Sequence, residues 1–204
     1  MKKLFLLIVC CLGLQDLRAA EVPPGVKEHP LVRNLLAEHY IHIHGEGRIN
    51  VAYEKALAML ELEDVLTEIQ RAYTDLLPEG EEAEFVITLE NQRVYSFVNR
   101  KQQHTRIEEL LRESSGVGGT DMVLYAEGVR GFGPFQSLTW IRVFPCETDP
   151  DVSEWRVQVY AFPQNSVSRF FARNLGIARR FFHRKTAEIS ELATGITLHL
   201  FNES

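Results

Sequence analysis

The segment from Met122 to Phe162 limits the choice of fold most strongly, because it is the part of the chain richest in strand-like sequence. Apolar and polar residues alternate along 137–144 and 155–162, and both runs are rich in β-branched and aromatic residues. Such alternation is typical of strands with one buried face. Together with a shorter apolar run at 122–126, these patterns predict three strands of one sheet.

A glycine-rich stretch, 127–135, separates the first two of these strands. Its three glycines and one proline favour the turns and bulges of a wide hairpin. Glycine-rich loops can also present backbone N–H groups to an anion, and Arg130 would add a charge-assisted contact. In this second interpretation, Phe132 and Phe135 form a rim over a ligand pocket. The stretch lacks the Lys-Ser/Thr pair of a phosphate-binding loop.

Helical periodicity with start and stop signals is found on both sides of the segment. It predicts helices over 30–44, 50–78 with a break near 61–64, 105–111, and 165–193. Alternating sequence predicts a further strand pair across 84–99 and a closing strand at 196–201. The expected fold class is therefore α+β. We expect a mostly antiparallel sheet of about five or six strands, covered by N-terminal helices and a long C-terminal helix.

Residues 1–20 have the three-part layout of a secretory signal peptide. Two lysines precede an apolar run at 4–14, and small residues follow at Ala19 and Ala20. The apolar run is too short to span a bilayer. We therefore expect export to the periplasm or the extracellular space, with cleavage after Ala19 or Ala20.

A lipoprotein signal at Cys10 or Cys11 is disfavoured, because neither cysteine follows one of the small residues that such signals normally carry. Removal of the signal peptide would leave an extended leader at 21–29 and a single α+β domain at 30–204. Cys146 would then be the only cysteine of the mature chain. An intramolecular disulfide is excluded in that case, and a buried thiol is the simplest expectation.

The charge and hydropathy of the chain limit its partners. The full sequence has a formal net charge of −6, and loss of residues 1–20 would remove three cations and one anion and bring it to −8. This acidic balance disfavours nucleic acid as a partner. Because no second long apolar run follows the signal peptide, we expect no transmembrane span in the mature chain.

One basic surface is expected against this acidic background. On the C-terminal helix, four arginines fall at offsets of 0, 4, 11 and 15 residues: Arg169, Arg173, Arg180 and Arg184. At about 100° per residue they span only about 60° of the helix circumference. This arginine stripe could contact anionic lipid headgroups, an acidic polymer or an acidic protein. Alternatively, acidic residues from the first half of the chain neutralise it.

A histidine cluster made of His39, His42, His44 and Glu46 lies near the end of the helix expected at 30–44. Histidine and carboxylate side chains can bind zinc or act in acid–base catalysis. The spacing does not match HExxH, and histidines near a helix C-terminus are also favoured by the helix dipole. The cluster is therefore a weak metal candidate, and we predict no cofactor.

Three functions fit these patterns. The first is an exported, non-catalytic binding protein for a lipid or other apolar or anionic small molecule, because aromatic residues such as Trp140 and Phe135 accompany the arginine stripe. The second is an interaction or assembly protein of the cell envelope that has no small ligand. The third is a metal-dependent hydrolase built on the histidine cluster. An enzyme is the less favoured class, because no nucleophile elbow, catalytic Cys/His signature or nucleotide loop is present.

Overall fold

The computed structural model describes residues 22–38, 41–115, 118–130, 133–165 and 177–202, with the side chains of the last helix described from Thr186 to Phe201. In chain order the elements are α1 (Pro24–Lys27), α2 (Pro30–Glu38), β1 (Ile41–Ile49), α3 (Tyr53–Leu60), α4 (Val65–Asp75), β2 (Phe85–Asn91), β3 (Val94–Asn99), β4 (His104–Ser115), β5 (Gly119–Arg130), β6 (Gly133–Pro145), β7 (Ser153–Pro163) and α6 (Ile177–Asn202).

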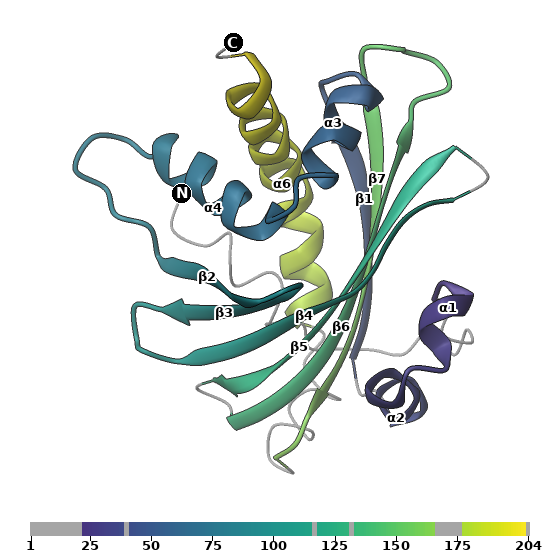
Figure 1. Cartoon of the computed structure of the whole chain (residues 1–204), viewed down its shortest axis with the longest axis vertical. Coiled ribbons are helices and arrows are strands. Elements are labelled where there is room, and N and C mark those ends of the chain that lie inside the picture. The colour runs from purple at the N-terminus through teal and green to yellow at the C-terminus, as the bar shows by residue number, and fades with distance from the viewer. Residues whose placement is uncertain (1–21, 39–40, 116–117, 131–132, 166–176, 203–204) are drawn as a thin grey trace.

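Seven strands in the described ranges form one sheet in the order β1-β7-β6-β5-β4-β3-β2, and each neighbouring pair is antiparallel. Figure 1 shows this sheet curving around α6. The α+β class is confirmed, but the strand count exceeds the five or six expected. Among the helices that the structure describes, none has the length and apolarity needed to cross a bilayer.

The first additional strand is β1. A helix was expected over 30–44, but α2 ends at Glu38 and the chain then becomes extended. In the sequence IHIHGEGRI of β1, an apolar residue or glycine alternates with a polar residue, and β7 pairs with the strand along its whole length. This period of two places His42, His44 and Glu46 on one face of an edge strand. The prediction that they lie at a helix end is wrong.

The second additional strand is β4. The Thr105 and Glu108 pair resembled a helix-capping box, and a short helix was expected over 105–111. Instead, both residues belong to a long strand that pairs with β3 on one side and β5 on the other. Two hydrogen-bonded ladders outweigh a local capping preference, because strand formation depends on neighbours that are distant in the sequence.

At the other end of the chain, the closing strand expected at 196–201 is wrong, because α6 continues to the end of the described residues. Leu192 and Ile196 are one helical turn apart and both pack into the core. The hydroxyl of Thr197 donates to the backbone carbonyl of Ala193 at 2.7 Å, so this polar side chain is satisfied within the helix.

The remaining local predictions fare better. The three central strands, the pair across 84–99 and the helix break near 61–64 are all confirmed. The leader expected to be extended at 21–29 contains the helical turn α1, and its Val26 is buried. The glycine-rich stretch forms a hairpin, as the first interpretation held, but a tight one, since Arg130 of β5 already pairs with Gly133 of β6.

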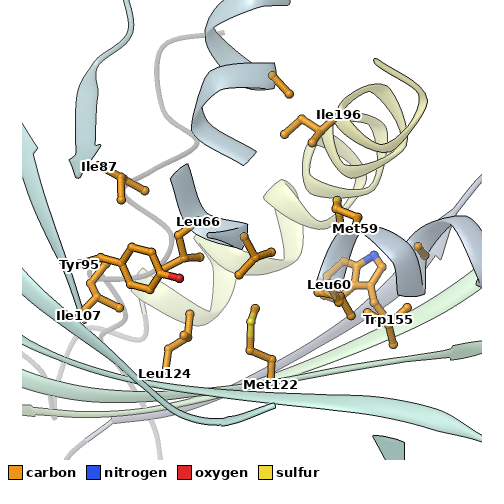
Figure 2. Close-up of a cluster of buried hydrophobic side chains, with 14 of the residues drawn as sticks. Met59, Leu60, Leu66, Ile87, Tyr95, Ile107, Met122, Leu124, Trp155 and Ile196 are labelled. Atoms are coloured by element: carbon orange, nitrogen blue, oxygen red, sulfur yellow. The ribbon is translucent and has the colours of Figure 1, made fainter. Parts of the chain in front are cut away.

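Different helices cover the two faces of the sheet (Figure 1). The concave face packs against α3, α4 and α6, and Figure 2 shows the centre of this core. The convex face packs against α1 and α2. Side chains that mark the concave core are Leu60, Met122, Trp155 and Ile196, and those that mark the convex core are Val26, Val32, Leu138 and Tyr160.

Arg112 ties the junction between α3 and α4 to the sheet. A β-bulge in β4 pairs Glu109 with one residue of the concave core and Arg112 with another, so both side chains lie on that face. Arg112 binds the Glu109 carboxylate and donates to the backbone carbonyls of Leu60, at 2.9 Å, and Leu62. These carbonyls at the end of α3 lack helical partners, so Arg112 caps the helix.

The contact between Arg112 and Glu109 joins two buried charges. The Glu109 side chain is fully buried and that of Arg112 is only 12% exposed. Burial alone would lower the pKa of Arg112, but the hydrogen bonds and charges of Glu109 and, to a smaller extent, Tyr95 together outweigh burial and raise it. Arg93 also lies 3.7 Å from the Glu109 carboxylate, but its side chain is 54% exposed, so removal of Arg112 would leave the buried charge of Glu109 poorly compensated.

We therefore expect Arg112→Ala to lower the free energy of unfolding by about 3–5 kcal/mol, as measured by urea denaturation. Arg71→Ala is the matched control, because Arg71 is 66% exposed and forms an ion pair with Glu68 on the same helix. It should cost less than about 1 kcal/mol. Equal losses in the two variants would contradict the role of Arg112 as a clamp.

Candidate functional site

A cavity of about 270 Å³ lies between the concave face of the sheet and helices α3, α4 and α6. Its floor includes Met122 from β5, Ile141 from β6 and Val157 from β7. The roof comes from α3 and α4, and one wall comes from α6. Described residues of these three helices that line it include Met59, Ile69, Tyr73, Ile189, Leu192 and Ala193.

Local sequence explains why these side chains meet. Alternate residues of a strand point to the same face, so Thr139, Ile141 and Val143 of β6 all line the cavity. On α6, residues spaced by three or four positions form one stripe, which includes Leu192 and Ile196. Curvature of the sheet then separates floor from roof, which leaves room that side chains do not fill.

The polar groups at the cavity margin are largely engaged with protein atoms. Gln70 accepts from the backbone N–H of Ile87 at 2.6 Å, which fixes α4 to the edge strand β2. The indole of Trp155 donates to Ser190 at 3.0 Å. Burial, followed by the charges of Glu84 and Glu81, raises the pKa of Tyr73, so this phenol is neutral at physiological pH.

Consequently, none of the described lining residues carries a charge at neutral pH. Cavities with apolar walls remain dry or take up apolar molecules. This site can therefore bind a hydrocarbon-like molecule by shape and apolar contact.

Trp155 shows how closely β1 approaches the wall of the site. A Cβ atom on Gly47 of β1 would lie 2.9 Å from the Trp155 ring and 2.6 Å from the Ser190 hydroxyl. Only glycine therefore allows the strand to pass beside the indole without displacing it. The close fit fixes Trp155 against α6, and with it one end of the cavity.

Two of the predicted ligand-binding residues come together on the concave face. The Arg130 guanidinium lies over the ring of Phe97, at 4.7 Å from its centroid, and 6.0 Å from that of Phe135. Phe97 and Phe135 are both 3% exposed, so the cation stands on a buried aromatic platform. Phe132, predicted as part of the same rim, lies outside the described residues.

Trp140, a further predicted ligand-binding residue, does not line the cavity. Its position in β6 turns the ring to the convex face, where it packs on the core beneath α1 and α2. There the indole donates to the Asp121 carboxylate at 2.7 Å. The period of two separates it from its neighbours Thr139 and Ile141, which line the cavity.

The arginine stripe remains a prediction. Arg169 and Arg173 lie outside the described residues. Arg180 and Arg184 belong to α6, but the described side chains of this helix begin at Thr186.

The histidine cluster does not form a metal site in the part of the chain that is described. His42 stacks on Tyr160, with ring centroids 4.5 Å apart, and lies 3.2 Å from the Gln158 side chain oxygen. His44 and Glu46 follow on the same exposed face of β1, and no group of three metal-binding side chains is found among the described residues. His39 lies outside them.

Most residues that line the cavity were not predicted to be site residues. Residues such as Met59, Ile69 and Leu192 carry the ordinary helical pattern of a packed core. That pattern shows which side of a helix is buried, and it does not show whether the buried side meets other side chains or empty space. Trp155, which lines the cavity, was predicted only as part of a strand.

No family model matches the chain, and no curated protein matches its sequence. Solved structures resemble it in fold. A hypothetical protein from Helicobacter pylori is 10% identical with a TM-score of 0.50, over 91% of this chain and 98% of that protein. Norcoclaurine synthase from Thalictrum flavum, in complex with dopamine and hydroxybenzaldehyde, is 12% identical with a TM-score of 0.47. The similarity covers 80% of this chain and 87% of the synthase. A START superfamily protein from Mycobacterium smegmatis is 9% identical with a TM-score of 0.45, over 80% of this chain and 99% of that protein. At these identities the likeness concerns the fold alone.

A larger side chain in the wall should close the cavity. We expect Ala193→Phe to lower the affinity for the neutral apolar dye N-phenylnaphthylamine by about tenfold, or about 1.4 kcal/mol of binding free energy. The measurement is a fluorescence titration. Val86→Phe is the matched control, because Val86 is 52% exposed on the outer side of β2. Equal dye affinity in the two variants would show that the dye binds elsewhere.

Proposed function

We propose that this is an exported, non-catalytic binding protein that holds a lipid or other apolar small molecule in the concave cavity. The observation that carries the proposal is the cavity of about 270 Å³ with no charged group among its described lining residues. The cavity is partly open to the surface, so its apolar walls are available to a ligand. Concave apolar sites of this kind are typical of small-molecule binding.

The construction of the roof supports the same proposal. Arg112 holds the α3–α4 junction through backbone carbonyls, and Gln70 holds α4 to β2. Both contacts are polar and directional, and both attach the roof at its margin. The roof is therefore held without side chains that fill the centre, which favours a pre-formed binding space.

The alternatives have less support. An interaction or assembly protein of the envelope stays a prediction, since no feature of the described surface favours it over ligand binding. The metal-dependent hydrolase needs three ligands near one point, and the described members of the histidine cluster follow one another along an exposed strand.

Native mass spectrometry of the full protein, purified gently from the cells that make it, tests the proposed function. We expect a reproducible extra mass that passes into organic solvent on denaturation. The Ala193→Phe variant, expressed and purified in the same way, should carry less of it. A bare protein mass for both would contradict the proposal and favour the interaction protein, whereas a mass removed by a chelator would favour the metal site.

Export has its own test. The signal peptide expected at 1–20 predicts that the mature protein begins at Ala20 or Glu21. N-terminal sequencing of the protein from its native cells measures this directly. A protein that retains Met1 or Lys2 would contradict export by this route.

A further inference from the structure

One hydroxyl group interrupts the apolar floor of the cavity. Thr139 of β6 lines the cavity and is only 3% exposed, so its side chain borders the cavity rather than the outer surface. Its cross-strand neighbours are Leu124 of β5 and Val159 of β7, which offer no polar side-chain atom. Among the described residues, none forms a hydrogen bond with the Thr139 hydroxyl. Because an unpaired buried hydroxyl destabilises a fold, this one calls for a partner from outside the protein.

Thr139 differs in this respect from two other hydroxyls of the concave face. Thr105 of β4 and Ser137 of β6 are also without a hydrogen-bond partner in the described structure, but protein atoms enclose their hydroxyl oxygens. Neither residue lines the cavity. Of these three hydroxyls, only that of Thr139 can be reached by a molecule in the cavity.

A water molecule is a poor partner for Thr139. Buried water is normally held by two to four polar groups. The other polar side chains of the described lining are Gln70, Tyr73 and Trp155, and the Trp155 indole already donates to Ser190. Gln70 and Tyr73 belong to α4, which Gln70 attaches to β2, and three strands separate β2 from β6. A molecule held by apolar contacts along its body, by contrast, needs only one polar partner.

The surroundings of Thr139 limit the chemistry of this partner. The hydroxyl can donate one hydrogen bond and can also accept. None of the described lining residues is charged at neutral pH. An ionised group in the cavity would lose its hydration without meeting an opposite charge, which is costly. The group that complements Thr139 is therefore an uncharged oxygen, as in a ketone or an alcohol.

The strand register gives the position of this oxygen. Thr139, Ile141 and Val143 form the row of β6 that lines the floor, and Trp155 of β7 lies opposite Val143. Thr139 thus marks one end of the row and Trp155 the other. Four residues of a strand span about 13 Å. An oxygen bound at Thr139 would lie near one end of an elongated apolar body.

We propose that the ligand carries one uncharged oxygen, in a ketone or hydroxyl group, near one end of its hydrocarbon body, and that the Thr139 hydroxyl binds this oxygen. Thr139 is then the residue that distinguishes such a molecule from a plain hydrocarbon. This inference rests on the proposed function, because the cavity must first accept the hydrocarbon body. It adds the polar group, which the apolar lining does not specify.

The probes 2-nonanone and 2-methyl-1-nonene test this assignment, because they differ only in the replacement of the carbonyl oxygen by a CH₂ group. Displacement of N-phenylnaphthylamine measures the affinity for each. Thr139→Val replaces the hydroxyl with a methyl group of similar size. It should weaken binding of 2-nonanone about fivefold, or by about 1 kcal/mol, and should not weaken binding of 2-methyl-1-nonene. Its ligand-free Tm should not fall, because an unpaired hydroxyl has been removed.

Thr105→Val is the matched control. It makes the same chemical change at a threonine that is 1% exposed on the concave face, has no described partner and does not line the cavity. Its affinities for both probes should stay within about twofold of the wild-type values. An equal loss of 2-nonanone binding in the two variants would contradict a local role for Thr139.

Two further results would overturn the inference. The first is undiminished binding of 2-nonanone by Thr139→Val. The second is a lower ligand-free Tm in that variant, which would mean that the hydroxyl has a partner in the free protein. The dye distinguishes these failures from failure of the proposed function. If the dye and 2-methyl-1-nonene bind but 2-nonanone does not depend on Thr139, only the inference fails; if none of the three binds, the proposed function fails as well.

Discussion

The contact between Arg112 and the end of α3 anchors one margin of the roof over the concave cavity. The sheet curves away from its covering helices, so α3 and α4 would gain apolar contacts by settling onto the floor. Arg112 opposes this movement, because its guanidinium is fixed to the carbonyls of Leu60 and Leu62 and to the buried Glu109. The β-bulge in β4 contributes to this anchor, because it places both Glu109 and Arg112 on the concave face. A polar anchor at the margin maintains an apolar opening at the centre.

The concave face is divided into two chemical regions along the strands. Toward the ends of β6 and β7 nearest α3, its residues are apolar, and the cavity lies there. Toward the β5–β6 hairpin, Arg130 lies over the buried rings of Phe97 and Phe135. The two ends of the concave face therefore differ in chemistry, because one is apolar and the other carries a cation on aromatic rings.

Sequence patterns predicted the parts of the fold that are encoded locally. The central strands alternate over many residues, and the break between α3 and α4 interrupts a clear helical period. β1 and β4 were missed because their strand character depends on partners far along the chain, while His44 and Thr105 carry local helix-end signals. Trp140 and Trp155 show why the site residues could not all be predicted. Both lie in strands with clear alternation, but the sequence does not reveal which face of the sheet becomes concave. Arg130 and Phe135 were predicted as site residues because charge beside aromatic residues in a glycine-rich turn is unusual; the structure brings them together on the concave face, and their role in binding stays a prediction.

The sheet order also affects how the protein folds during synthesis. β1, the first strand to leave the ribosome, pairs only with β7, the last, and Ile41 lies opposite Ala161. The intervening chain must be synthesised before this edge can form, so pairing at β1 is among the least local contacts in the fold and is slow to form. Until then the alternating apolar side of β1 stays uncovered, open to chaperones or to other chains. The order of strands therefore determines how long the nascent chain exposes this edge to aggregation.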